Sequence, residues 1–274
     1  MEEGFKKLKK FKSKMKLEII EKKQDKIVFI IKGINTTIAN TIRRSIQEVP
    51  TLAIDEVEFI KNDSALYDEI IAHRLGLIPL KKEKGIRLRE ECSCGGKACS
   101  KCTITLKLYA KGPCRVYSGN LEDNKIVIYK NMPIVDLAKD QELEFNAYAK
   151  LGIAREHTKF SPGLIFFKPL VKIESLNDCN LCKACVESCP LKLLEISNNR
   201  VTLKELEKCD LCEACIEACK KQGKDALKIT ASEHDFIFTL ESWGQLDIRD
   251  ILIGICKAID KNLTELEKEV SKLD

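Results

Sequence analysis

Residues 179–190 read CNLCKACVESCP, and residues 209–219 read CDLCEACIEAC. In both runs the cysteines follow the spacing C-x2-C-x2-C-x3-C, and each cysteine of the first run recurs 30 residues later in the second. Three thiolates at this spacing line one tight loop around a cubane iron–sulfur cluster, while the fourth cysteine begins a short helix directed at a second cluster. The repeat therefore predicts two [4Fe–4S] clusters.

The fourth cysteine of each run is expected to bind the cluster of the other run. The predicted ligands are Cys179, Cys182, Cys185 and Cys219 for the first cluster, and Cys209, Cys212, Cys215 and Cys189 for the second. Zinc is the alternative metal, but it prefers paired C-x2-C knuckles. Lys220 replaces the proline that follows the first run at Pro190. The segment resembles the compact two-cluster ferredoxins, and this resemblance indicates a cofactor rather than a function.

A second cysteine group lies upstream, with the spacing C-x-C-x4-C-x2-C; its members are Cys92, Cys94, Cys99 and Cys102. Gly95 and Gly96 allow a tight turn between the two halves of the group. Four cysteines within 11 residues suit a closed tetrahedral Zn²⁺ site, so one zinc ion is the expected ligand, with a metal-free loop as the alternative. Of the two isolated cysteines, we expect Cys256 to be a small buried residue on an apolar helix.

The charge and cysteine content indicate where the protein works. Fourteen cysteines without an apolar secretory segment predict a reducing compartment, and we expect a cytoplasmic protein with no membrane contact. The net charge of +5 lies in a basic tail, residues 1–16, and the rest of the chain is neutral overall. We therefore expect no direct sequence-specific binding of nucleic acid. Either Met1 or Met15 can be the natural start, because strand patterning begins only at Leu17.

Outside the cysteine groups, the spacing of the hydrophobic residues changes along the chain between the period of a β-strand and the period of an α-helix. Residues 17–32 predict a β-hairpin, and residues 35–49 predict a helix capped by Asn35 or Thr36. Short alternating segments within 51–149, including one at Ile126 and Ile128, predict a mostly β unit. After it, strands are expected at residues 163–173 and 235–240, followed by a long amphipathic helix at 246–273 that needs a partner surface.

This order predicts an α+β fold in which one body is built from both ends of the chain. Its expected parts are residues 17–50, 150–175 and 228–274. A β-rich domain at residues 51–149 and the ferredoxin-like domain at residues 176–227 are inserted into that body.

Several motifs, in order along the chain, resemble the α-type assembly subunits of DNA-directed RNA polymerases. They are NTIRRSIQEVP at 40–50, LAIDEV at 52–57, HRLGLIPL at 73–80, GPCRVYS at 112–118 and HTKFSP at 157–162. The cysteine group at 92–102 is similar to the zinc loop of the third-largest subunit of eukaryotic RNA polymerase II. A ferredoxin-like insertion before the last strand and helix is similar to the arrangement in the archaeal D-type members of the family. The resemblance covers essentially all of residues 17–274.

The resemblance implies an assembly role with specific partners. Family members pair with a small α-like subunit, called L in archaea, and the pair nucleates assembly of the two large catalytic subunits with other small assembly subunits. The discontinuous body would then be a dimerisation domain. The implied partner-binding residues are Ile38, Ile42, Arg43, Arg44, Ile46, Ile251, Ile255 and Ile259. The two arginines would face the large subunits, and a solvated helix face is the alternative for them.

No catalytic residue is expected in this chain, which would be part of an enzyme only within the complex. It lacks the Asp-x-Asp-Gly-Asp run that could hold two Mg²⁺ ions, and it has no P-loop or Gly-x-Gly-x-x-Gly fingerprint. The alternative function is an electron-carrier subunit of an anaerobic iron–sulfur oxidoreductase, which leaves residues 17–170 unexplained. The clusters themselves are either a folding staple or a redox switch, and the small size of the insertion favours the staple.

Overall fold

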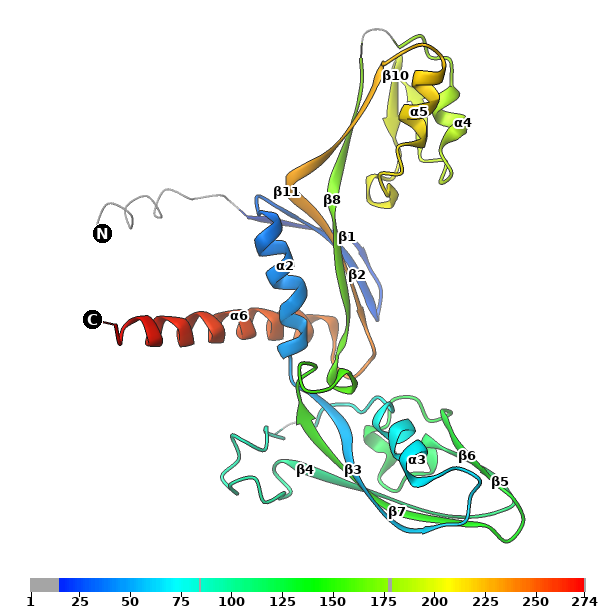
Figure 1. The fold of residues 1–274 in the computed structure, drawn as a ribbon, viewed down its shortest axis with the longest axis vertical. Coiled ribbons are helices and arrows are strands. Elements are labelled where there is room, and N and C mark those ends of the chain that lie inside the picture. The colour runs from blue at the N-terminus through cyan, green and yellow to red at the C-terminus, as the bar shows by residue number, and fades with distance from the viewer. Residues whose placement is uncertain (1–14, 84, 177–178, 274) are drawn as a thin grey trace. The chain divides into compact units, whose positions relative to one another are not determined.

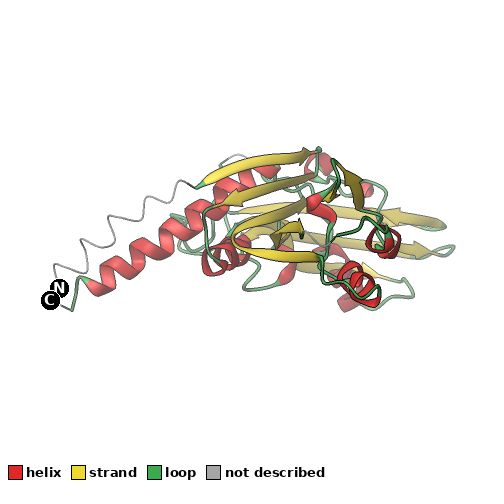
Figure 2. Cartoon of the chain, turned by 90° about the horizontal axis from the view of Figure 1, so that it is seen from above, coloured by secondary structure: helices red, strands yellow, loops and turns green. Residues whose placement is uncertain are grey.

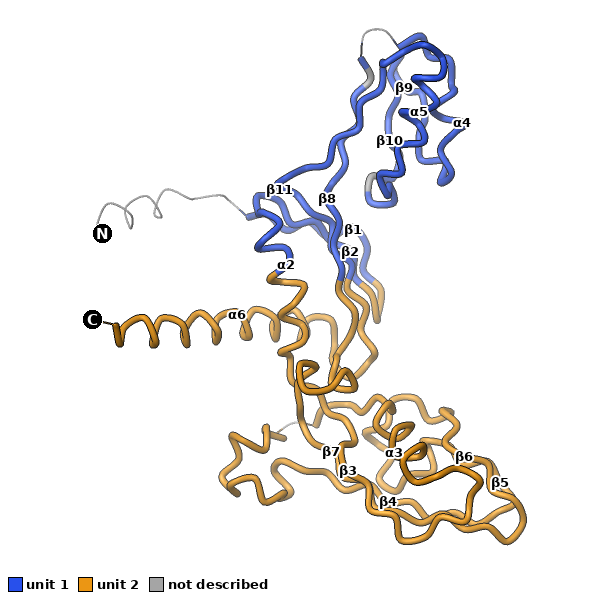
Figure 3. The backbone as a smooth tube through the Cα atoms, in the orientation of Figure 1, with its two compact units in different colours: residues 1–22, 27–40, 166–239 blue, residues 23–26, 41–165, 240–274 orange. Residues whose placement is uncertain are grey.

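The computed structural model describes residues 15–83, 85–176 and 179–273, so the predicted basic tail lies outside the described residues except for Met15 and Lys16. The chain divides into two units (Figure 3). Unit 1 comprises the described residues up to Lys22, residues 27–40 and residues 166–239; unit 2 comprises residues 23–26, 41–165 and 240–274. No helix among the described residues is long and apolar enough to cross a membrane.

A four-stranded sheet joins the start of the chain to its second half (Figure 1). Its order is β1 (Lys16–Lys22), β2 (Lys26–Lys32), β11 (Leu227–Ser242) and β8 (Gly163–Ser175). β1 and β2 form the predicted antiparallel hairpin. Phe29 of β2 stacks on Phe238 of β11, with ring centroids 5.4 Å apart, and both rings are buried. Stacked aromatic rings stabilise a fold beyond the contribution of the apolar area that they bury, so this pair stabilises the centre of the sheet.

The first described helix, α2 (Thr36–Ser45), follows the hairpin and continues into the short 3-10 turn η1 (Ile46–Glu48). Asn35 caps it, because the Asn35 Oδ1 atom accepts the backbone N–H of Ile38 at 2.9 Å. Val49 and Pro50 follow this turn, and β3 begins at Thr51. Ala39 is buried and Ile38 is 42% exposed, so only one face of this helix packs within the chain.

The inserted region between residues 51 and 152 is built on an antiparallel sheet in the order β3-β7-β4. Its strands are β3 (Thr51–Asn62), β7 (Glu142–Gly152) and β4 (Thr103–Lys111), and a separate pair is formed by β5 (Cys114–Tyr117) and β6 (Pro133–Leu137). Phe145 and Leu106 lie in the core of this region, together with Ile71 and Leu75 of helix α3 (Asp68–Gly76). This large apolar core is the main source of stability that the region itself provides.

Two features of this region differ from the sequence-based expectation. Helix α3 was not predicted, although Ile71 and Leu75 are buried at helical spacing. The strand predicted at Ile126 and Ile128 was wrong, because the 3-10 turn η3 (Asn124–Ile126) and one bridge between Leu80 and Val127 occupy that place.

The cysteine-rich segment in unit 1 consists of two similar halves. The first contains α4 (Ala184–Ser188) and β9 (Leu194–Ser197), and the second contains β10 (Arg200–Leu203), the turn η5 (Leu206–Lys208) and α5 (Ala214–Lys221). β9 and β10 pair antiparallel. The apolar core here is small, with Leu194, Val201 and Leu227 as its buried non-cysteine members. Such a core is too small to stabilise the segment without further links.

The chain ends in α6 (Ile248–Val270), a single uninterrupted helix of 23 residues (Figure 2). Its first half packs within unit 2, where Ile251 and Ile255 are buried and Gly254 lies against Val49. Residues 260–270 are exposed on every side of the helix. Cys256 is exposed, so the prediction that it is buried was wrong; Ile251 and Ile255 occupy the packed face, and Cys256 follows about 100° further around the helix.

Candidate metal centres and partner surfaces

Each of two cavities in unit 1 is lined by four cysteines. One cavity brings together Cys179, Cys182, Cys185 and Cys219; the other brings together Cys189, Cys209, Cys212 and Cys215. Each cavity therefore takes three cysteines from one run and the fourth from the other run, as the spacing predicts. The surface that faces each cavity is mostly apolar, with Val201 and Leu227 in the first cavity and Leu194 and Leu203 in the second.

The cysteine loops share a backbone conformation that sequence reasoning did not foresee. Leu181 and Lys183 have positive φ values of 58° and 66°, and their counterparts 30 residues later, Leu211 and Glu213, have φ of 61°. Non-glycine residues adopt this left-handed region rarely, and where they do the conformation is often tied to a functional site. Its occurrence at matched positions in both halves indicates that the loop shape is needed to aim the cysteines inward.

The thiols differ in burial and in acidity. Cys185 and Cys215 are each 7% exposed, and burial raises the pKa of the Cys185 thiol and raises the pKa of Cys215 to about 11. A cation in the cavity would favour the thiolate form of these residues. Cys182 and Cys212 are exposed. Thiol donors within a largely apolar wall are the environment that iron–sulfur clusters use, so the residues fit the predicted group.

Two hydrogen bonds support the second cavity. The backbone N–H of Leu193 donates to Cys189 Sγ at 3.4 Å. Lys168 Nζ, on strand β8, donates to the backbone carbonyl of Cys209 at 2.9 Å. Contacts of this kind orient a ligand and tune a bound metal centre.

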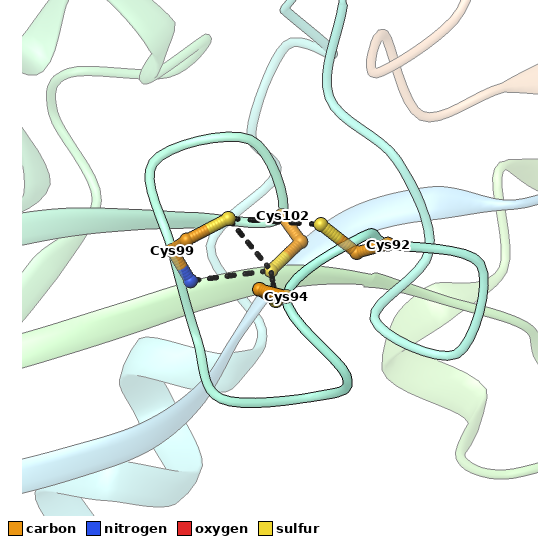
Figure 4. A group of neighbouring side chains, drawn as sticks. All are labelled: Cys92, Cys94, Cys99 and Cys102. Carbon is orange, nitrogen blue, oxygen red and sulfur yellow. Dashed lines mark hydrogen bonds between the residues drawn. The ribbon is translucent and has the colours of Figure 1, made fainter.

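The upstream cysteine group also converges (Figure 4). The Sγ atoms of Cys92, Cys94, Cys99 and Cys102 all lie within 4.8 Å of one another. Three of the pairs are 3.6 Å (Cys92 and Cys99), 3.7 Å (Cys94 and Cys102) and 3.9 Å (Cys99 and Cys102) apart. A tetrahedral zinc ion with Zn–S bonds of about 2.3 Å separates its sulfurs by about 3.8 Å. The loop therefore has nearly the geometry that a tetrahedral site requires.

The acidity of these thiols is uneven. The Cys92 thiol donates to Cys94 and thereby lowers the pKa of Cys94 to about 7. For Cys92, the backbone N–H of Cys94 lowers the pKa, but the neighbouring thiols and burial outweigh it and raise the pKa to about 11. One member of the group is thus readily deprotonated, as a first ligand to an incoming cation should be.

The predicted partner-binding residues fall into two classes. Ile46, Ile251 and Ile255 are buried in unit 2, so they pack within the chain and are not available to a partner. Ile42, Arg43 and Ile259 are half-buried, and Ile38 and Arg44 are exposed.

Other exposed apolar residues were missed. On β1, Leu17 and Ile19 are 58% and 57% exposed, although they pair with the buried Ile31 and Phe29 of β2. On α6, Leu263, Leu266 and Val270 are 59%, 60% and 53% exposed. The sequence shows the alternation of apolar residues in β1 and their helical spacing in α6. It does not show which side of each element is left uncovered.

Comparison with known proteins finds two protein-family models that match this chain. Residues 38–166 match the RNA polymerase Rpb3/RpoA insert domain, and residues 172–220 match the 4Fe-4S dicluster domain, which indicates iron–sulfur binding. The chain is 36% identical to DNA-directed RNA polymerase subunit Rpo3 of Archaeoglobus fulgidus over 94% of this chain and 98% of that protein. It is 40% identical to Rpo3 of Methanothermobacter thermautotrophicus, over 88% and 94% of the two chains.

A eukaryotic protein matches as well. The RNA polymerase II subunit rpb3 of Dictyostelium discoideum is 35% identical, over 93% of this chain and 95% of that protein. The resemblance expected from the motifs and the predicted α+β class with two inserted domains are confirmed. The chain belongs to the Rpo3/Rpb3 family of DNA-directed RNA polymerase subunits.

Proposed function

We propose that this chain is an assembly subunit of DNA-directed RNA polymerase, which pairs with a small α-like subunit (L) and then recruits the two large catalytic subunits and other small subunits. The observation that carries the proposal is the similarity to Rpo3 over nearly the full length of both chains. Nucleotide addition is the work of the assembled enzyme, and we assign no catalytic residue to this chain.

Each unit offers its own candidate contact surface of exposed apolar residues for this pairing. In unit 1 these are Leu17 and Ile19 of β1 with Ile38 of α2. In unit 2 they are Leu263, Leu266 and Val270, which recur at helical spacing on α6. Exposed apolar stripes on a strand and on a helix are typical of surfaces that are covered by another protein. The dimerisation domain would comprise residues 17–50, 150–175 and 228–274, with 51–149 and 176–227 as insertions.

Co-expression of this chain with the small α-like subunit tests the pairing. The wild-type pair should elute as a heterodimer in size-exclusion chromatography, and Leu266→Asp should dissociate it. Lys268→Asp is the matched control, because it introduces the same residue on the opposite side of the same exposed helix, about 200° away. A wild-type chain that remains monomeric with the small subunit present would refute the proposal.

We further propose two [4Fe–4S] clusters and one Zn²⁺ ion. The ligand sets are those of the two cavities in unit 1 and of the four-cysteine loop in unit 2. The clusters act chiefly as a folding staple, a role supported by the small apolar core around them. A redox switch on assembly is the other candidate, and it predicts a reversible effect of oxygen on pairing. Replacing Cys182 and Cys212 with serine and measuring assembly separates the two roles in part, because unchanged assembly excludes a staple that the polymerase requires.

An electron-carrier role would rest on residues 172–220 alone, since that is the part that matches a dicluster domain. Co-purification from cells distinguishes the two functions. Large polymerase subunits retained by this chain support the assembly role, and a flavoprotein or hydrogenase retained instead supports electron transfer.

A further inference from the structure

The two cysteine loops of unit 1 have nearly the same backbone but carry different charges. Leu181 and Lys183 have φ values of 58° and 66°, and their counterparts Leu211 and Glu213 both have φ of 61°. In each loop the first three cysteines of the run line one cavity. A difference between the two proposed clusters should therefore come largely from the side chains that the loops do not share.

Two of these side chains differ in charge. The neutral Asn180 corresponds to the acidic Asp210, and the basic Lys183 corresponds to the acidic Glu213. Asn180 and Lys183 line the first cavity, whereas Asp210 and Glu213 line the second. At these matched positions the second loop is more negative than the first by three unit charges.

This difference in charge acts on the ease with which each cluster is reduced. A cluster that takes up an electron becomes more negative by one unit charge. A positive side chain nearby favours that change and a negative one opposes it, so the reduction potential of a cluster follows the charges around it. The cluster of the first cavity should therefore have the higher reduction potential.

Two contacts at the second cavity act in the opposite direction. Lys168 Nζ, which donates to the carbonyl of Cys209, brings one positive charge to this site. The N–H of Leu193 donates to Cys189 Sγ, and hydrogen bonds to a ligand sulfur also affect the potential of a cluster. Neither contact reverses the order, because Lys168 offsets one of the three unit charges and the N–H of Leu193 is a dipole and not a full charge.

We infer that the two clusters are reduced one after the other, and that the cluster of the first cavity takes up the first electron. In each step one [4Fe–4S]²⁺ cluster accepts one electron from a low-potential one-electron donor and becomes [4Fe–4S]⁺, and no bond forms or breaks. The charges of Lys183, Asp210 and Glu213 set this order. The inference rests on the two proposed clusters and deepens that proposal, since it gives the segment a one-electron state in which the electron has a defined site.

An EPR-monitored redox titration of the anaerobically purified full chain, with dithionite as the reductant, tests the order. The wild type should show two midpoint potentials at least about 59 mV apart, equivalent to about a tenfold preference for one cluster in the half-reduced protein. Raising the salt concentration from about 0.1 M to about 1 M should narrow the separation, because the Debye length falls from about 10 Å to about 3 Å.

The iron content separates failure of the inference from failure of the proposal beneath it. A single midpoint potential in protein that holds about eight irons per chain would overturn the inference and leave the two clusters intact. Wild-type protein with clearly fewer irons would overturn the two-cluster proposal, and the inference with it.

Single substitutions identify the cluster that is reduced first. Two reduced clusters repel each other, so two midpoint potentials can also arise from equivalent clusters. Lys183→Gln should lower the higher potential, and Glu213→Gln should raise the lower one. With equivalent clusters, Lys183→Gln would instead lower the lower potential and Glu213→Gln would raise the higher one, and that outcome would overturn the inference. Lys139→Gln, at an exposed turn residue of unit 2, is the control and should leave both potentials in place.

A double variant tests the cause directly. Asp210→Asn with Glu213→Lys gives the second loop the charges of the first, so the separation should narrow more than in either single variant. The fold should tolerate both changes, because Lys183 already has a positive φ at the position matching Glu213. Asp210 Oδ1 accepts the N–H of Cys212 at 3.3 Å, and an amide oxygen can accept the same bond. A double variant that holds about eight irons and keeps the wild-type separation would overturn the inference.

Discussion

The two cysteine-rich regions of this chain are built in opposite ways. The loop at residues 92–102 collects four thiols from one short stretch, and it adjoins a region that has a large apolar core of its own. The segment at residues 179–219 collects two groups of four thiols, and each group draws one member from the other half of the repeat. A metal in the loop would fix a local turn, whereas metals in the repeat would link its two halves.

The apolar cores of the two regions differ in size, so we expect the two regions to depend on bound metal to different degrees. Burial of side chains such as Phe145 and Leu106 stabilises the insert domain by about 1.5–3 kcal/mol per large apolar residue, whatever the loop binds. The ferredoxin-like segment has only a few buried aliphatic residues apart from its cysteines. With the two proposed clusters bound, its stability should come mainly from metal–thiolate links, so the two regions should respond unequally to the loss of one ligand.

The largest effect is expected from Cys215→Ala. Cys215 is buried and lies at the start of α5, the helix that also carries Cys219 into the other cavity. Losing its cluster should disorder that helix and weaken the other site, so anaerobically purified protein should fall from about eight irons per chain to fewer than about four. Iron and acid-labile sulfide analysis measures this. Cys256→Ala, at an exposed thiol of α6, should keep the full content. Four irons retained in the Cys215 variant would mean that the sites are independent.

A smaller and local effect is expected from Cys99→Ser. Zinc should fall from about one ion per chain to none, while the iron content stays unchanged. The unfolding temperature of the insert domain should fall by about 4–16 °C, equivalent to about 1–2 kcal/mol, because we expect its large apolar core to supply most of its stability. Hydrogen exchange should accelerate in residues 87–102 and stay slow in β4 and β7. Cys114→Ser, at an exposed cysteine of β5, is the control. Unfolding of the whole insert domain would contradict the comparison.

The cysteine groups could be predicted because metal binding by cysteines depends on their spacing within a short stretch of sequence. The repeat indicated the division of eight cysteines into two sets, and the structure brings the same residues together in two cavities. The left-handed residues Lys183 and Glu213 were not predictable, because nothing in their side chains requires a positive φ. Their conformation depends on the direction in which each loop must carry its thiols.

The apolar stripes of the partner surfaces could be predicted from the sequence, but which residues of each stripe remain exposed could not. Ile251, Ile255 and Leu266 all lie on the apolar stripe of the last helix, and periodicity cannot tell whether such a stripe is covered by the same chain or by another. The tertiary structure separates them: Ile251 and Ile255 are buried, and Leu266 is 60% exposed.

The smallest effect is expected at an ion-paired carboxylate of β3 in unit 2. Asp55 of β3 binds Lys150 at 2.7 Å and Lys159 at 2.6 Å, and all three side chains are largely buried. Burial acts to raise the pKa of Asp55, but hydrogen bonds from Lys150 and Lys159 outweigh it and hold the pKa below its ordinary value of 3.8. A carboxyl group whose pKa is lower in the folded state stabilises the fold above its unfolded pKa, and this contribution is lost as pH falls through the folded pKa.

Asp55→Asn should therefore lower the free energy of unfolding of the insert domain by about 1 kcal/mol at neutral pH, a value reduced by partial solvent screening. The gap between variant and wild type should be constant above about pH 5 and should close as the pH falls below 3.8. Denaturant unfolding at a series of pH values measures it. Asp136→Asn removes the exposed pair with Arg115 and should have a smaller effect, because both of its side chains are more than half exposed. A gap that widens on acidification would mean that burial, and not the two lysines, sets the pKa of Asp55.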